Sequence, residues 1–401
     1  MDKFFIKIKT ERIQIDKKVF VSLFDITPIK QYVAYQKAIS ENEISFTDLK
    51  ILAEKADIPY PLFFAPKNIV DTQIKDKNKN LFEKLPTKKE MQMGFRGGMK
   101  LADVELIVKD IGRKQEFLKK RIYTPRFDNK FIGLVSKKVK MGETNIIIAK
   151  DIREYLDIDL VEMRKLPKAG VLDYICRKAE KKDIFVSFSS HDYMPQNLDI
   201  NIGLSGLCIK DKKYPFIFIN TRDGDAKPKI LESSGRQIFT LISMLVHISM
   251  NKFFLSTKTG HMKDKNTKQI FSIVGEILIP ETDIVNLHIS NLDDLKYNSK
   301  IFKVTPSMLL SRLQELKLIP KPLADNLRFN LSKEILSIKP GIPRRPLPIN
   351  GYAKYNGERL FRDVIRANQS GKVSQIETKN ILFRKGKMDT ALFQLCIQRY
   401  K

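Results

Sequence analysis

The spacing of hydrophobic and polar residues along the chain predicts a protein built mainly of helices with a few short strands. Residues 45–58, 101–122 and 171–181 each repeat apolar side chains every three or four positions, as amphipathic helices do. Residues 304–319 follow the same pattern, and Thr305 stands where an N-cap is needed. These four segments are therefore predicted to be helices with one face in a core.

The centre of the chain carries the clearest strand signals. Residues 206–210 and 216–220 are short β-branched and aromatic runs on either side of polar turn residues, which predicts an antiparallel hairpin. Residues 236–254 follow and are apolar almost all the way round, so we expect a helix that is buried on most sides. A further helix around 268–279 is expected to end at Pro280.

The order of these elements predicts four regions. We expect a helical module at 1–66, a linker or long loop at 67–100 where charges of both signs and three glycines cluster, a core at 101–300, and a basic helical module at 301–401. Within the last region, a Pro-rich stretch at 339–352 separates the final helices. The expected fold class is α+β, with a small antiparallel sheet packed by helices and flanked by helical modules at both ends.

The charge of the chain points to a negatively charged partner. There are 73 Lys and Arg against 46 Asp and Glu, a formal net charge of +27, which favours a polyanion or an acidic protein. Residues 1–66 hold ten basic and nine acidic side chains, whereas residues 339–401 hold fourteen and four. Residues 67–338 carry the remaining +16 of the net charge, so a phosphate-binding surface is predicted in the middle or the C-terminal part of the chain. The C-terminal part is the better candidate, and a solvated basic face is the alternative. Its candidate residues are Arg312, Lys317, Arg344, Arg345, Lys354, Arg359, Arg362 and Arg366.

Cysteine content and segment lengths exclude several classes of protein. The three cysteines, Cys176, Cys208 and Cys396, are widely separated, which excludes a disulfide framework and a thiolate zinc finger and favours a reducing cytoplasm. The first residues, MDKFFIKIKTERIQID, contain no apolar run of signal-peptide length, so no leader is expected. No stretch reaches the ~20 apolar residues of a membrane span, and no membrane association is expected.

A series of motifs resembles one known family. YPFIFIN (214–220) followed by RQIFTL (236–241) resembles the ImmA/IrrE family of zinc metallo-endopeptidases, in which an apolar strand ending in IN precedes FTLAHELAH. Residues 49–64 resemble the repressor-like helix-turn-helix end that long members of the family carry. The family's later helices resemble residues 270–280, 302–319 and 356–382. The resemblance covers most of the chain and implies a zincin-like core.

The same resemblance places a degenerate zinc site on the predicted buried helix. The family's HExxH motif supplies two His ligands one turn apart and a Glu base, but this chain has Ser243 for the first His and Met244 for the Glu, and keeps only His247. The segment expected to supply the third ligand, 265–270, has no acidic residue. Because catalytic zinc needs three protein ligands and methionine cannot accept a proton, we expect no zinc, no other cofactor and no peptidase activity.

The remaining polar residues carry weaker signals. His247 is expected to be a core histidine rather than a relic metal ligand, Cys208 a small buried residue, and Ser243 a packing serine. The helix-turn-helix-like region, with a net charge of +1, fits packing or dimerisation as well as DNA binding. A rebuilt metal site would have to regroup residues from separate segments, namely His191, His261 and His288 with Glu276, Glu281 or Asp283.

Three functional hypotheses follow. The first, implied by the resemblance, is a non-enzymatic regulator in a mobile-element, phage or toxin–antitoxin context that docks on a repressor-like or antitoxin-like protein, with DNA as a further partner. The second is a nucleic-acid-binding protein that uses the basic C-terminal region. The third is an active zinc metallo-endopeptidase with a rebuilt site. Assembly into a homo-oligomer is compatible with all three.

Overall fold

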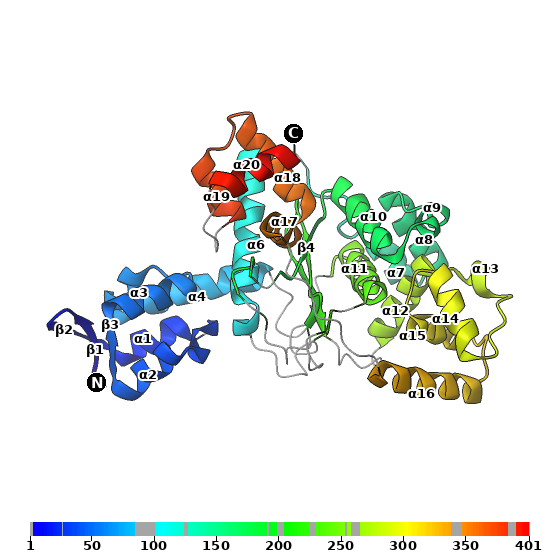
Figure 1. The fold of residues 1–401 in the computed structure, drawn as a ribbon, viewed down its shortest axis with the longest axis horizontal. Coiled ribbons are helices and arrows are strands. Elements are labelled where there is room, and N and C mark those ends of the chain that lie inside the picture. The colour runs from blue at the N-terminus through cyan, green and yellow to red at the C-terminus, as the bar shows by residue number, and fades with distance from the viewer. Residues whose placement is uncertain are drawn as a thin grey trace.

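Helices dominate the computed structural model of the chain, which also contains three small sheets among its described residues (Figure 1). The described residues are 3–25, 27–84, 101–123, 127–190, 192–196, 198, 204–223, 230–231, 233–252, 255–257, 265–337, 347–383 and 390–400. Within these ranges, none of the helices combines the length and the apolar character that crossing a bilayer requires.

Three strands and several helices make up the N-terminal module. Strands β1 (Lys3–Ile8) and β2 (Glu11–Asp16) form an antiparallel hairpin, and β3 (Glu43–Ser45) pairs parallel to β1. The strand order is therefore β2-β1-β3. The module's helices are α1 (Lys17–Phe24), α2 (Val33–Glu41) and α3 (Phe46–Lys55).

This module is α+β, whereas the sequence analysis expected helices alone. The difference arises at β1, where Phe4 and Ile6 are buried at the two-residue period of a strand and Phe4 stacks on Phe20 at 4.2 Å between ring centroids. The helix expected at 45–58 is confirmed as α3. Ser45 caps it by accepting a hydrogen bond from the backbone N–H of Asp48 at 3.0 Å.

Helix α4 (Lys67–Lys84) occupies the first half of the expected linker. The mixed charges of this segment resembled a loop, but it contains neither glycine nor proline, and its lysines and glutamine are good helix formers. Val70 anchors the helix in the core of the N-terminal module. The second half of the expected linker, 85–100, lies outside the described residues.

The central sheet has the strand order β4-β6-β5-β9. Strands β5 (Leu204–Ile209) and β6 (Phe216–Ile219) are antiparallel, which confirms the predicted hairpin. Strand β4 (Phe185–Phe188) runs parallel to β6, so the sheet is mixed and not purely antiparallel as expected. Strand β9 (Leu255–Thr257) pairs with β5, and a separate ribbon consists of β7 (Arg222–Asp223) and β8 (Ile230–Leu231).

The two faces of the central sheet belong to two separate hydrophobic cores, because successive strand residues point to opposite sides. Cys208 and Ile217 face the first core, and Leu207 and Phe216 face the second. The first core is built with helices α7 (Ser136–Met141), α8 (Asn145–Leu156), α9 (Leu160–Lys165), α10 (Lys168–Lys181), α11 (Ser234–Ser249), α12 (Lys265–Leu278) and α13 (Glu281–Ile284).

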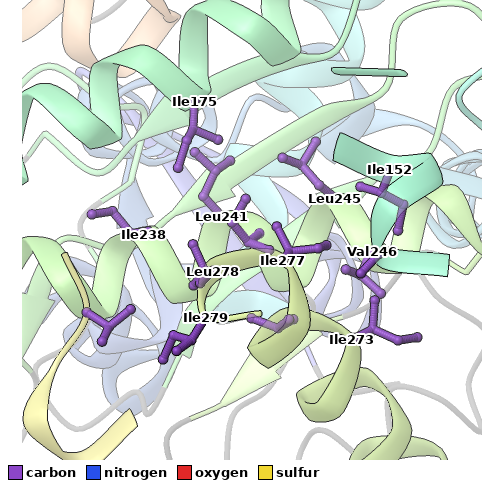
Figure 2. Packing of buried hydrophobic residues seen from close by; sticks show 14 of the residues in the cluster. Ile152, Ile175, Ile238, Leu241, Leu245, Val246, Ile273, Ile277, Leu278 and Ile279 are labelled. Atoms are coloured by element: carbon purple, nitrogen blue, oxygen red, sulfur yellow. The ribbon is translucent and has the colours of Figure 1, made fainter. Parts of the chain in front are cut away.

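Helix α11 lies at the centre of the first core. Figure 2 shows Leu241 and Leu245 of α11 among Ile175 of α10 and Ile277 of α12. Every residue from 240 to 250 is buried, which confirms the prediction of a helix covered on most sides. Helix α12 is likewise confirmed, and it stops before Pro280.

The expected C-terminal module, 301–401, is divided between the two cores. Helices α14 (Leu292–Ile301), α15 (Pro306–Glu315) and α16 (Lys321–Ser337) join the first core. The remaining helices pack in the second core together with α6 (Glu105–Phe117). Figure 1 shows that they lie far from α16. They are α17 (Pro348–Asn356), α18 (Glu358–Gln369), α19 (Gln375–Leu382) and α20 (Thr390–Arg399). The predicted helix at 304–319 is α15, and Thr305 caps it.

Candidate functional site

The residues where the motif resemblance placed a degenerate HExxH lie inside the first core. Ser243, Met244 and His247 of α11 are all buried. The Sδ atom of Met244 stands 3.3 Å from the Sγ atom of Cys208 on β5, so the side chain packs against the sheet. A thioether in that contact excludes water and accepts no proton, which leaves no general base at the position where the ImmA/IrrE pattern has its glutamate.

The imidazole of His247 is neutral at any ordinary pH. Burial, with a smaller contribution from the positive charge of Lys252, lowers the pKa of His247 to about 3. The burial agrees with the expectation of a core histidine. Neutral imidazole can bind a metal, but neither the Ser243 hydroxyl nor the Met244 thioether is a ligand that zinc favours.

The described residues do not regroup into another metal site, since no three His, Cys, Asp or Glu side chains converge among them. Glu276 and Asp283 are instead ion-paired, with Arg312 and Arg164 respectively. His288 is exposed. The other two histidines of the expected regrouping, His191 and His261, lie outside the described residues.

Arg312 is a structural residue and not a phosphate ligand, which corrects the sequence analysis. Its side chain is only 4% exposed and forms an ion pair with Glu276, whose own side chain is 3% exposed. Its second guanidinium nitrogen lies 2.9 Å from Glu315. Gly275 makes room for the arginine, because a β-carbon there would stand 2.9 Å from Arg312 Cδ. A guanidinium fully engaged in this way cannot reach a polyanion outside the molecule.

Arg359 is also engaged inside the fold. Its Nη2 atom lies 2.7 Å from Asp183, and its guanidinium donates to the backbone carbonyl of Glu180. The charge lies over the rings of Tyr123 and Phe185, at 5.4 and 5.2 Å from their centroids. These contacts tie α18 to the end of α10 and leave less of the Arg359 guanidinium for phosphate than the sequence analysis expected.

The other predicted phosphate ligands are scattered. Lys354 donates to Thr221 Oγ1 at 3.1 Å, and Arg362 lies 3.2 Å from Asp363. Lys317 and Arg366 are exposed, but the first follows α15 on one core and the second belongs to α18 on the other. The fold thus forms no single basic surface from them. Arg344 and Arg345 lie outside the described residues.

A different group of cations does come together, around a hollow of about 370 Å³ that we call the basic hollow. Two of its lysines, Lys130 and Lys181, are exposed at its edge. Phe127 stands beside them with 78% of its surface exposed. The full lining is Phe127, Asp128, Asn129, Lys130, Tyr155, Lys181, Lys182, Asp183, Lys213 and Tyr214.

Strand pairing explains why these lysines meet. Because β4 runs parallel to β6 with Phe185 opposite Phe216, the residues just before each strand lie side by side. Those residues are the lysine-rich segments 181–184 and 212–215. Asn129 fastens the two, since its Nδ2 donates to the Lys182 carbonyl at 2.9 Å and its backbone N–H donates to the Lys212 carbonyl at 2.8 Å.

One of the two acidic residues of the basic hollow is paired with a cation. Asp183 faces Arg359, as described above. Lys182 lies 3.0 Å from Asp157 and 5.3 Å over the ring of Tyr155. These contacts partly neutralise the positive charge of Lys182. The remaining lysines, together with the exposed ring of Phe127, form the combination that binds phosphates and stacks on bases. In the sequence, this site was signalled by the surplus positive charge in the middle of the chain and by the short Lys-Lys pairs at the ends of predicted elements.

Comparisons with protein-family models, with curated proteins and with solved structures found no match to this chain. The geometry of the residues therefore carries the functional argument, together with the motif resemblance described above.

Proposed function

We propose that this chain is a non-catalytic regulatory protein of the cytoplasm that acts by binding, with a repressor-like or antitoxin-like protein as its partner. The observation that carries the proposal is the contact between Met244 and Cys208, with 3.3 Å between their sulfur atoms. It places an apolar side chain in the sheet core at the position that a zinc peptidase needs for its base. What remains at that site is a scaffold without a hydrolytic group.

The class of partner rests on the resemblance to ImmA/IrrE proteins, which work with repressor-type regulators in mobile elements, phages and toxin–antitoxin pairs. A chain that keeps the order of their motifs over most of its length, and replaces two zinc ligands and the base, fits a role in which docking persists without cleavage. An active peptidase with a rebuilt site finds no support in the described residues, because Glu276 and Asp283 are ion-paired elsewhere.

Nucleic-acid binding is the second candidate, and the basic hollow is the observation that favours it. Four lysines offer phosphate contacts within one hollow, and the exposed ring of Phe127 offers a stacking surface beside them. Phosphate binding by basic side chains, as inferred from the net charge, is thus proposed for the segments before β4 and β6 and no longer for the C-terminal arginines.

Co-purification tests the first candidate. The chain is expressed with the small repressor-like or antitoxin-like protein encoded beside it, and the pair is followed by size-exclusion chromatography and by mass spectrometry of the partner. A stable complex with an intact partner is the expected result. Cleavage of the partner, or no complex with it, would refute the proposal.

Fluorescence polarisation with labelled oligo(dT) at ~50 and ~200 mM salt tests the second candidate. The triple variant Lys130→Glu, Lys181→Glu and Lys213→Glu should weaken binding and reduce the salt slope by about 2, at ~0.7 for each lost phosphate contact. Phe127→Ala should cost about 1–3 kcal/mol if a base stacks there. The matched control reverses three exposed lysines away from the hollow, Lys300, Lys317 and Lys321. If only the control variant lost affinity for oligo(dT), the binding site would lie on the C-terminal helices instead.

A further inference from the structure

The outer edge of β2 is an unpaired sheet edge among the described residues. The N-terminal sheet has the order β2-β1-β3, so β2 pairs with β1 on one side and with no described strand on the other. It has six residues, against three in β3 at the opposite edge. Figure 1 shows it at the end of the N-terminal module that points away from the central sheet. An edge strand of this length is a template on which another strand can pair.

The backbone of β2 presents hydrogen-bonding groups at this edge. The N–H of Phe5 donates to the Asn42 carbonyl at 2.9 Å, beside β3, so Phe5 directs its backbone groups away from β2. These groups alternate in direction along a strand, and Ile6 therefore directs its own toward Ile13, its partner in the ladder. The positions of β2 that direct backbone groups outward are then Arg12, Gln14 and Asp16.

The apolar face of the N-terminal sheet continues onto β2 and is left partly uncovered there. Ile13 lies opposite Ile6 in the register and Ile15 lies opposite Phe4, so all four share one face. Phe4 and Ile6 are 0% exposed, whereas Ile13 is 38% exposed and Ile15 is only partly buried. The helices of the module thus cover the middle of this face but not its edge. A strand added to β2 would extend the face and cover Ile13.

The order of side chains along β2 is complementary to itself when two copies run antiparallel. With Gln14 opposite Gln14 of a second copy, Ile13 comes opposite Ile15, and the apolar faces of the two sheets continue into each other. In the same register Arg12 comes opposite Asp16, which places unlike charges together at both ends of the strand pair. Charged residues usually protect an edge strand from pairing, but in this order they favour a second copy.

Neighbouring registers lose this match. A shift of the second copy by two residues sets Glu11 opposite Ile15 in one direction and Ile13 opposite Lys17 in the other. Either shift places a charge against an isoleucine and separates the two unlike charges. A shift by one residue turns the apolar faces to opposite sides of the sheet. Both the apolar face and the charges therefore specify the register centred on Gln14.

The two charged groups are accessible for this pairing. Arg12 lies 2.8 Å from Glu43, but its side chain is 62% exposed and a guanidinium has five N–H donors. Asp16 caps α1 with one carboxylate oxygen, which accepts a hydrogen bond from the Lys18 N–H at 2.8 Å. A carboxylate has acceptor sites on both oxygens, so the cap and the contact with arginine are compatible.

We propose that β2 is the interface of a homodimer, in which two copies of the chain pair antiparallel about Gln14. The two N-terminal sheets then form one sheet of order β3-β1-β2-β2-β1-β3. A two-fold axis between the two Gln14 residues makes the contact isologous, so the assembly closes at two copies. The proposal rests on the N-terminal module alone and is independent of the partner protein and of nucleic acid.

Sedimentation velocity of the full-length protein from ~1 to ~100 μM measures this assembly, and the wild type should pass from monomer to dimer as its concentration rises. Gln14→Pro removes an outward N–H at the centre of the interface and leaves the ladder with β1 intact. It should raise the dissociation constant of the dimer at least about tenfold, whereas the matched control Gln14→Thr, which keeps the N–H, should dimerise. A wild type that stays monomeric, or equal dimerisation of the two variants, would overturn the proposal.

A cysteine at position 14 tests the register, and it decides alone if circular dichroism shows that Gln14→Pro is unfolded. In the proposed dimer two Gln14→Cys residues lie directly opposite each other, within the ~4.4–6.8 Å between Cα atoms that a disulfide spans. Two residues of the control Glu11→Cys lie six positions out of register, roughly 20 Å apart.

Non-reducing electrophoresis after mild oxidation measures the cross-linked dimer, and the wild type gives the background from Cys176, Cys208 and Cys396. Gln14→Cys should give at least about ten times more cross-linked dimer than Glu11→Cys, because only the first pair meets the geometry of a disulfide. Equal cross-linking of the two variants, or no cross-linking of Gln14→Cys above the wild type, would refute the proposed dimer.

Discussion

At position 275 the difference between glycine and alanine decides whether α12 and α15 can keep their ion pair. A β-carbon there would stand 2.9 Å from Arg312 Cδ, well inside ordinary contact distance. The Arg312 side chain would have to shift, and because it and Glu276 are both buried, such a shift disturbs their ion pair. A single added methyl group at position 275 is therefore expected to weaken the buried ion pair of Arg312 with Glu276.

Gly275→Ala is expected to lower the free energy of unfolding by about 1–3 kcal/mol, measured by urea denaturation. Arg312→Ala should cost more, about 3–5 kcal/mol, because it leaves the Glu276 carboxylate buried without its partner. In the double variant, Gly275→Ala should add little to the stability lost by Arg312→Ala, because the arginine side chain that the new β-carbon would contact is absent. Full additivity of the two losses would show that the contact is not the cause.

Glu180 makes stability depend on pH near neutrality. Burial raises the pKa of Glu180 to about 7, and the neighbouring Arg359 offsets this only in part. A carboxyl whose pKa is raised in the folded state favours folding while it is protonated, and that contribution is lost as the pH rises from about 4.5 through 7. The folded protein therefore carries an unfavourable buried charge above neutral pH.

Glu180→Gln is thus expected to gain stability relative to the wild type as the pH rises from 5 to 8, by up to about 3 kcal/mol. Urea unfolding of both proteins at the two pH values measures the difference. Glu154→Gln, at a side chain that is 65% exposed, is the matched control and should show no such trend. A pH-independent difference for Glu180→Gln would contradict the assignment.

At the scale of the elements, α11 and β5 show what occupies the position where the resemblance expects a catalytic glutamate. The two sulfur atoms of Met244 and Cys208 fill the interface between helix and sheet. Restoring the family's glutamate there would put a carboxylate into that apolar contact. A carboxylate there would be buried against the sulfur of Cys208 with no water to solvate it.

Met244→Glu is expected to lower the free energy of unfolding by about 3 kcal/mol or more, whereas Met244→Leu should cost less than about 1.5 kcal/mol. Thermal or urea unfolding distinguishes the two. Similar stabilities for both variants would show that the position faces water, and the catalytically degenerate interpretation would lose its main structural support.

At the scale of the whole molecule, the purified protein is expected to contain well below one zinc per chain. Ser243 and Met244 are poor ligands, and a single imidazole, that of His247, does not hold the ion. Elemental analysis of protein prepared with zinc in the medium measures this directly. About one zinc per chain, lost on His247→Ala, would overturn the non-catalytic assignment.

Local patterns were sufficient for those parts of the molecule whose structure depends on near neighbours. The hairpin of β5 and β6, the buried helix α11 and the Thr305 cap of α15 were all predicted, because periodicity and capping involve residues only a few positions apart. The expectation that the chain binds no zinc likewise rests on residue identity, at Ser243 and Met244. Strand β1 was missed because a short alternation in a charged segment is a weak signal.

Long-range contacts decided the rest. The sequence shows that Arg312 and Arg359 are cationic, but only the packing of helices reveals that Glu276 and Asp183 already engage them. In the same way, the parallel pairing of β4 with β6 brings two lysine segments together that are about thirty positions apart in the sequence. The sequence determines the chemical type of each side chain. Whether a charged or polar group is free to bind a ligand depends on neighbours that are distant along the chain.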